Sequence, residues 1–333
     1  MASFAYKQLR SQADDAIRAA GKAAARLVLL HAAVSLGLSL LITGLDYVLE
    51  RGIAQTGGLG SMDTRAVLET IQTLLTYVQT LALPFWAMGY VFAVLRMARR
   101  EPVQNTDLLT GFRWFGAVLR ASFLRAAVYF VLLMVGAQVA RLIFMLTPAA
   151  QDMIRISQQF MVEETLDYAA LLENDAYMQA MIPAIPYMLA GMLLPVIPVY
   201  YRLRMMDYVL MDEPQRGALY ALLQSIRLTR KKSWALFRLD LRFWWFYLLQ
   251  LMTMVLGYGD MLLPMLGVKL SMGHDAAMYL FYALALVAEM ALYIWRKNQV
   301  YVTYGLVYDQ LRLQEPEQPQ PRPQPENVPW NYG

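Results

Sequence analysis

Long apolar runs alternate with short charged segments along most of the chain. A helix needs about 20 mostly apolar residues to cross the hydrocarbon core of a membrane. Six stretches are this long: Leu27–Val48, Leu74–Leu95, Leu124–Leu146, Met181–Tyr201, Phe243–Leu266 and Ala276–Trp295. A backbone in lipid must satisfy its own hydrogen bonds, so each stretch is predicted to be helical. The pattern predicts an all-α polytopic membrane protein, a bundle of about six transmembrane helices with interfacial helices on its cytoplasmic face.

The composition narrows the class further. Of the 333 residues, 58% are hydrophobic and 16% are charged, whereas soluble domains carry about 25% charged residues. This excludes a disordered protein, a secreted disulfide scaffold and most soluble enzymes. The chain has no cysteine and two histidines, so thiolate and multi-histidine metal sites are excluded as well. We therefore expect no metal and no cofactor.

The basic residues predict the orientation of the chain. Of the 29 Lys and Arg residues, five lie in residues 1–26, six in 96–125, nine in 202–242 and four after residue 295. Basic residues concentrate on the cytoplasmic side of a membrane, so both termini are predicted to be cytoplasmic in a multi-pass cell-membrane protein. The first span follows 26 residues that include Asp14 and Asp15, and it is longer than the apolar core of a cleaved signal peptide. It is predicted to remain in the protein.

Four segments are predicted from these boundaries. Residues 1–26 form a cytoplasmic amphipathic segment, and residues 27–313 form the six-helix membrane domain. The outer loop 148–180 carries six acidic residues between apolar ones at helical spacing, which predicts one or two surface helices. Its acids could bind a cation, but a solvated face is the favoured interpretation. The tail 314–333 holds six of the fifteen prolines and is predicted to be disordered.

Two cytoplasmic regions resemble each other. Pro84 is followed by Glu101–Pro102, and Pro195 is followed by Glu213–Pro214. Each region is predicted to contain an exiting helix, a charged turn, an interfacial helix and a re-entering helix. In the first, Gly89 lies four residues before another small residue, a spacing that favours close helix packing.

Five ionisable residues lie within the predicted spans, where charge is costly and marks candidate sites. Asp46, Arg141 and Asp260 are predicted near the outer boundary, and His31 and Glu289 lie nearer the inner side. They could form a substrate or proton site. The favoured interpretation is structural: Arg141 pairs with Asp46 or Asp260, and Glu289 pairs with His31 or extends towards water.

The basic loop 202–242 and the residues after it combine cations with aromatic side chains. Such a stretch anchors a helix at the membrane interface and attracts anionic lipid headgroups. Anchoring is the favoured interpretation, and specific lipid binding is the alternative. Nucleic acid is not expected as a partner, because a membrane surface has the same sign of charge as DNA. The candidate headgroup residues are Arg227, Arg230, Lys231, Lys232, Trp234, Arg238, Arg242, Trp244 and Trp245.

Three stretches of the chain carry distinctive motifs. The first is RREP at 99–102 with DLLTGFR at 107–113, the second is Ser225–Trp245, with its basic patch and LFRLDLRF run, and the third is Tyr304–Leu311. These stretches resemble domain-of-unknown-function family 975, a family of Gram-positive bacterial integral membrane proteins, in which the first reads R-G-E and D-L-F-x-G-F-K. Arg242 stands where the family usually has serine, and the segment between Trp245 and Tyr301 is longer than usual. The resemblance implies a multi-pass bacterial membrane protein and implies no activity.

No enzyme motif is present: the chain lacks the P-loop, H-E-x-x-H and G-x-S-x-G patterns. The neighbouring Ser271, His274 and Asp275 do not define a triad, which requires a specific geometry. The expected function is therefore non-enzymatic: a membrane scaffold, accessory subunit or envelope-homeostasis protein. A small-solute or lipid transporter is the alternative, and a membrane-embedded enzyme comes third. The expected partners are membrane lipids, with a membrane-protein partner or a second copy of the chain possible.

Overall fold

The computed structural model describes residues 6–55, 62–159, 161–162, 165–166, 175–259, 263 and 274–314. These residues are almost entirely helical. The two short strands, β1 (Met161–Val162) and β2 (Thr165–Leu166), pair antiparallel, with Met161 opposite Leu166. The helices of the N-terminal half are α1 (Tyr6–Ala20), α2 (Lys22–Gln55), α3 (Met62–Ala98), η1 (Asn105–Leu109), α4 (Thr110–Arg113), α5 (Phe115–Met145) and α6 (Pro148–Gln158). Those that follow are α8 (Asp175–Met181), α9 (Ala184–Leu203), α10 (Met206–Asp212), η2 (Pro214–Arg216), α11 (Gly217–Thr229), α12 (Ser233–Arg242), α13 (Trp244–Gly257), α15 (His274–Leu292), η3 (Tyr293–Lys297) and α16 (Asn298–Leu313).

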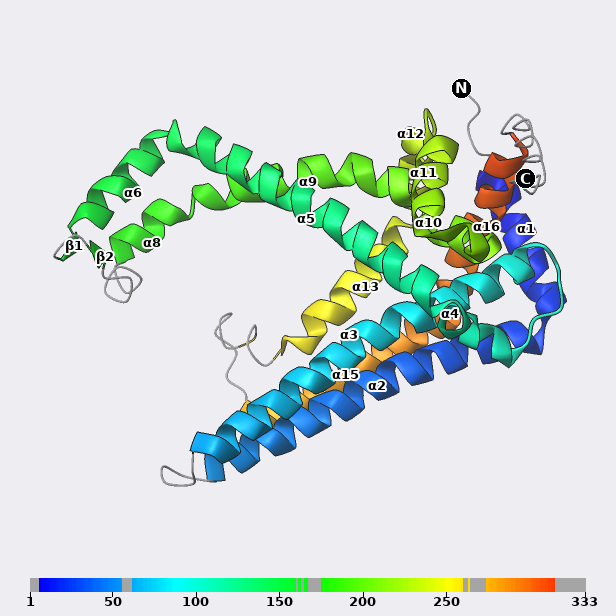
Figure 1. The fold of residues 1–333 in the computed structure, drawn as a ribbon, viewed down its shortest axis with the longest axis horizontal. Helices are drawn as coiled ribbons and strands as arrows, with labels where there is room; N and C mark the ends of the chain where they lie inside the picture. Colours follow the sequence, from blue (N-terminus) through cyan, green and yellow to red (C-terminus); the bar gives the residue numbers. More distant parts are fainter. Residues whose placement is uncertain are drawn as a thin grey trace, which may run out of the picture.

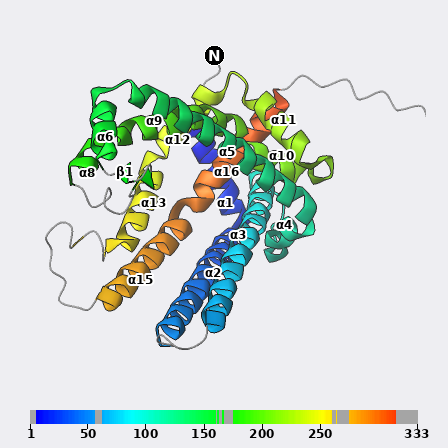
Figure 2. The ribbon, with the colours of Figure 1, turned by 60° about the vertical axis from the view of Figure 1, so that its left-hand side comes forward.

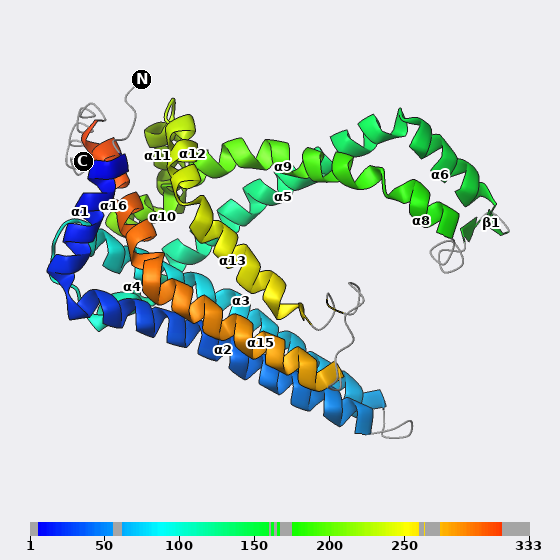
Figure 3. The same ribbon diagram turned by 180° about the vertical axis from the view of Figure 1, so that it is seen from behind.

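The long helices form three pairs that diverge from a common end of the molecule. α2 packs on α3, α5 on α9, and α13 on α15, and Figure 2 shows the three pairs separating away from that end. α1, α10, α11, α12 and α16 gather where the pairs meet (Figures 1 and 3). We call these five helices the base. The opposite end of the α5–α9 pair carries α6, α8 and the β1–β2 ribbon (Figure 1).

Within the described ranges, five helical stretches are long and apolar enough to cross a membrane: Lys22–Ile42, Ala66–Ala98, Phe115–Met145, Gln179–Asp212 and Ala277–Leu313. They overlap five of the six predicted spans. The remaining prediction, residues 243–266, coincides with the apolar helix α13 of 14 residues, which extends only about 21 Å. The all-α membrane class is thus confirmed for the part of the chain that the structure describes, with five long spans and one shorter apolar helix.

Glycines set the closest approaches between helices. A Cβ atom on Gly136 of α5 would lie 2.1 Å from the carbonyl oxygen of Gly191 on α9. Backbones that come this close require glycine at the contact. Gly89 also marks a close approach, because a Cβ there would lie 1.8 Å from the Leu108 carbonyl oxygen. The predicted close packing at Gly89 is therefore present, and its neighbour is the short helix η1.

The two similar regions have the predicted order of elements. In the first, α3 leads through a turn to η1 and α4, and α5 follows. In the second, α9 and α10 lead through η2 to α11 and α12, and α13 follows. In the second region the Ser225 and Thr229 hydroxyls donate to the Arg202 carbonyl oxygen over 2.8 and 3.1 Å. These bonds fix α11 against the end of α9.

The N-terminal amphipathic segment is the helix α1. Its apolar side chains Leu9, Ala13 and Ala16 are buried, and the helix packs mainly on α16. Gly21 ends α1 in the left-handed backbone region, with φ 54°, a conformation that glycine adopts without steric cost. The chain then turns into α2. The apolar face of α1 is thus covered by the protein itself.

Ion pairs join the helices of the base. Arg99, just after α3, donates through Nη1 to Asp212 Oδ1 at 2.6 Å and through Nη2 to Asp309 Oδ1 at 2.8 Å. These hydrogen bonds raise the pKa of the Arg99 guanidinium above its ordinary value. Arg312 contacts Asp212 as well and bonds Glu213 Oε1 at 2.7 Å. One cluster of charges therefore connects α3, α10 and α16.

Candidate functional site

A cavity of about 830 Å³ lies between α2, α3, α13 and the α15–η3 segment. Three ionisable side chains line it: His31 of α2, Glu289 of α15 and Lys297 of η3. They come from segments more than 250 positions apart in the chain, which the packing of α2 against η3 and α15 brings together. Two of the three, His31 and Glu289, are among the predicted intramembrane polar residues.

The lining combines ionisable, polar and aliphatic side chains. The three ionisable residues lie on the parts of α2, α15 and η3 that are nearest the base. The polar and aliphatic side chains include Ser35, Ser39, Gln250, Thr253, Leu83, Leu251, Met254 and Leu286. A cavity with a charged end and an apolar wall matches a molecule that has a polar head and an apolar chain.

The segment that presents Lys297 is a π-helix. η3 spans Tyr293–Lys297, between the α-helices α15 and α16. Such wide turns are rare and often occur at functional sites. The Lys297 side chain is buried, and its Nζ lies 3.7 Å from the Tyr293 ring centroid and 5.3 Å from that of Tyr90. Aromatic faces attract this cation, and no described carboxylate lies within ion-pair distance of it.

His31 is held rigidly beside this lysine. Its ring stacks on Tyr90, with centroids 4.5 Å apart, and lies parallel to Trp86 at 6.3 Å. The Trp86 Nε1 also donates to the His31 carbonyl oxygen over 3.2 Å. The His31 Nδ1 atom is buried and has no hydrogen-bond partner among the described residues. The imidazole therefore brings unused hydrogen-bonding capacity to the cavity.

The structure does not bond Glu289 to His31. The two residues line the same cavity, so they lie near each other as predicted but are not bonded to each other. Lys297 was not predicted as part of the site, because it follows the apolar run that ends near Trp295. A lysine directly after a span was the one available signal.

Of the other predicted intramembrane residues, Arg141 is the one whose side chain the structure describes, and it does not line this cavity. Arg141 is exposed on α5, whereas position 46 belongs to α2. These helices are in different diverging pairs (Figures 1 and 3), and the Asp46 side chain lies outside the described part of the chain. The pairing of Arg141 with Asp46 stays an untested prediction, and the separation of the helix pairs disfavours it. Asp260, its other predicted partner, lies outside the described residues.

The predicted headgroup residues fall in several environments. Trp234 and Trp244 are 62% and 59% exposed, as an interfacial anchor requires. Trp245, in contrast, packs against Trp295, with ring centroids 5.6 Å apart. Arg227 lies in the last turn of α11, and Arg230, Lys231 and Lys232 follow that helix. Arg238 and Arg242 lie on α12. The predicted stretch is thus partly internal packing and partly exposed charge.

The helices and the cavity define a polytopic α-helical membrane protein. The family described as "Protein of unknown function (DUF975)" matches residues 3–294, which is most of the chain. The chain belongs to this family, as the sequence resemblance predicted. The third resembling stretch, Tyr304–Leu311, lies beyond the matched residues. No curated protein and no solved structure matches the chain.

Proposed function

We propose that this chain is a non-enzymatic membrane protein that binds an anionic amphiphile in the cavity between α2, α13 and α15. The observation that carries the proposal is the buried Lys297 ammonium, which faces a cavity of about 830 Å³ and has no ion-pair partner among the described residues. A buried cation is destabilising unless it is directly paired, and Glu289 of the same cavity lies beyond ion-pair distance from it. An anionic head bound beside it would supply that charge.

The rest of the lining supports this class of ligand. His31 and the tyrosines offer hydrogen-bonding groups at the charged end, and the aliphatic side chains offer a surface for an acyl chain. Glu289 would orient the head through a hydroxyl or ammonium group of the ligand. Binding of such a molecule within the bilayer is the first step of lipid transport or of lipid sensing. In this proposal the base, with both termini, is cytoplasmic.

The test uses the purified protein in a neutral detergent. Dodecyl phosphate below its micellar concentration should raise the melting temperature of the protein. Inorganic phosphate should not, because it has no alkyl group to contact the aliphatic side chains of the cavity. Lys297→Met should lose most of the shift. Lys22→Met, which removes an exposed lysine at the start of α2, is the matched control and should retain it. Equal shifts in both variants, or none in the wild type, would overturn the proposal.

A scaffold or accessory subunit is the second candidate function, and the base favours it. Arginines beside it are paired with carboxylates of neighbouring helices, as Arg99 is with Asp212 and Arg125 is with Asp207 at 2.8 Å. These contacts hold the helix pairs together. A scaffold would tolerate Lys297→Met in cells, whereas an amphiphile-binding protein would lose its function with that variant.

A further inference from the structure

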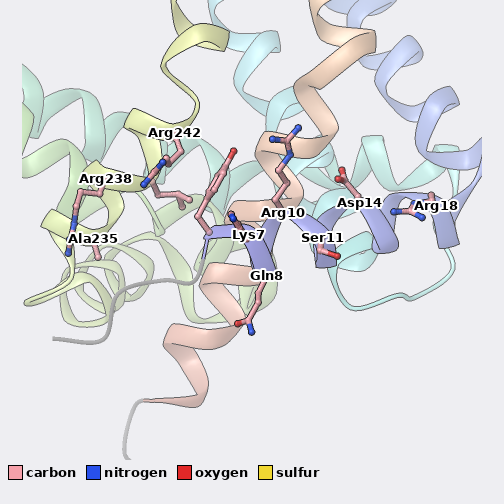
Figure 4. Close-up of a pocket in the computed structure, with 11 residues that line it drawn as sticks. Lys7, Gln8, Arg10, Ser11, Asp14, Arg18, Ala235, Arg238 and Arg242 are labelled. Carbon is pink, nitrogen blue, oxygen red and sulfur yellow. The ribbon is translucent and has the colours of Figure 1, made fainter.

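A second cavity, of about 940 Å³, lies in the base between α1 and α12. Figure 4 shows the side chains that line it: Lys7 and Arg10 on α1, and Arg238 and Arg242 on α12. The cavity shares no lining residue with the one that contains Lys297. We call it the basic cleft. Arg238 and Arg242 were predicted from the sequence as headgroup contacts. The basic cleft places Lys7 and Arg10 of α1 beside them.

The charges of the basic cleft are not balanced by the protein. Arg18, at its far end, pairs with Asp15 at 3.3 Å, and the Asp14 carboxylate accepts a hydrogen bond of 2.7 Å from Gln299. The other four cations, Lys7, Arg10, Arg238 and Arg242, form no ion pair with a described residue. In contrast, the arginines at positions 96, 99, 125, 204 and 312, in and beside the base, each meet a carboxylate. Four unpaired cations around one cavity attract an anion.

The basic cleft lies where two apolar helices leave the base. At one end, the Arg242 guanidinium lies 5.9 Å from the Tyr6 ring centroid, and Tyr6 packs edge-on against Phe243 at 5.7 Å. α13 begins at the next residue, Trp244, which is 59% exposed. At the other end, α1 stops at Ala20 and α2 begins two residues later. Both ends of the cleft are thus tied to the starts of membrane helices.

From this charge and this position, we infer that the basic cleft binds the phosphate headgroup of an anionic phospholipid. Guanidinium groups bind phosphate oxygens in pairs and favour them over neutral headgroups. The exposed Trp244 beside the cleft fits the boundary between headgroups and acyl chains. Because α1 precedes the α2–α3 pair and α12 precedes the α13–α15 pair, one bound lipid would join two of the three helix pairs at the base.

The experiment measures thermal stability of the full chain in nanodiscs of phosphatidylcholine alone or with one quarter phosphatidylglycerol. The wild type should melt several degrees higher with the anionic lipid, and native mass spectrometry should show phosphatidylglycerol retained. Lys7→Gln/Arg238→Gln should abolish the difference. Arg230→Gln/Lys231→Gln, which removes the same charge from the same basic loop outside the cleft, should keep it. If both double variants lost the difference in melting temperature equally, the anionic lipid would be attracted by the overall positive charge. That result would overturn the proposal of a specific site.

Two further arms complete the test. Inorganic phosphate and glycerol phosphate should not reproduce the stabilisation in phosphatidylcholine nanodiscs; if they do, the cleft is a site for a soluble anion and the lipid proposal fails. Ala235→Glu places a carboxylate at the cleft without removing a cation. This variant should fold, retain its melting temperature without anionic lipid, and lose the response to phosphatidylglycerol. A full response in Ala235→Glu contradicts the proposal even if the double variant does not fold.

Discussion

Arg99 and Asp212 are 113 positions apart, yet the Arg99 Nη1 and Asp212 Oδ1 atoms lie 2.6 Å apart in the base. Arg99 follows α3 and Asp212 ends α10, so this contact joins the two similar regions of the chain within two residues of their Glu–Pro turns. The side chain of Asp212 is only 8% exposed. The contact is therefore shielded from water and is specific to the folded state.

Arg99→Gln is expected to lower the free energy of unfolding by about 1.5–3 kcal/mol, because it removes charged hydrogen bonds from a shielded carboxylate. A double-mutant cycle with Asp212→Asn should show a coupling of roughly 0.5–3 kcal/mol. Denaturant unfolding in detergent measures both. The control is Arg216→Gln, which breaks the exposed Arg216–Glu213 pair of 2.9 Å and should cost under about 0.5 kcal/mol. Equal effects of the two single variants would contradict the structure.

The crossing of α5 and α9 should not accept a side chain at position 136. The Cβ of Gly136→Ala would lie 2.1 Å from a backbone oxygen, so the helices must separate, at a cost of about 1–3 kcal/mol. Gly37→Ala is the matched control, because nothing lies within 4 Å of a Cβ at Gly37. Melting temperatures in detergent would compare the two. A tolerated Gly136→Ala would show that the helices do not cross as closely as described.

Arg141 should be energetically independent of Asp46. The two positions lie on helices of different pairs. The stability changes caused by substitutions at distant sites add to within about 0.5 kcal/mol. The double variant Arg141→Gln/Asp46→Asn should therefore change stability by the sum of the single variants. A larger coupling would require α2 and α5 to approach each other and would contradict the divergence of their pairs.

The proposed orientation predicts which positions a thiol reagent reaches. The chain has no cysteine, so single cysteines can be introduced without a background. Cysteine at Gln158, at the end of α6, should react with an impermeant reagent on intact cells. Cysteine at Gln104, in the turn before η1, should react only after the membrane is opened. Reversed labelling would place the base, and with it both termini, outside the cell.

The spans were predictable because an apolar run is a local signal. Leu124–Leu146 needs no partner to be recognised, and α5 covers almost all of it. The position of a residue along its helix follows from the same local signal, but the direction in which its side chain points does not. Asp46 and Arg141 were assigned similar depths and lie on different helix pairs. The contact between Arg99 and Asp212 depends on how α3 and α10 meet, which no local pattern records.

Lys297 shows a further limit of the sequence. A lysine after an apolar run is normally assigned to the aqueous boundary, and its side chain is expected to extend outward. Here it is buried among tyrosine rings. The reason is the change of helix type at η3, which redirects the side chain. A pattern with a period of 3.6 residues contains no sign of that change.

The π-turn at Tyr293–Lys297 also sets the phase between two helices. A π-turn contains about one residue more than an α-turn, and one residue corresponds to about 100° around a helix axis. The faces of α15 and α16 are thus offset by a single inserted residue. α15 turns one face to α13, and α16 turns another to α1. Deleting one residue from this turn would rotate every side chain of α15 relative to those of α16. The packing of the α13–α15 pair on the base therefore depends on a single residue of this turn.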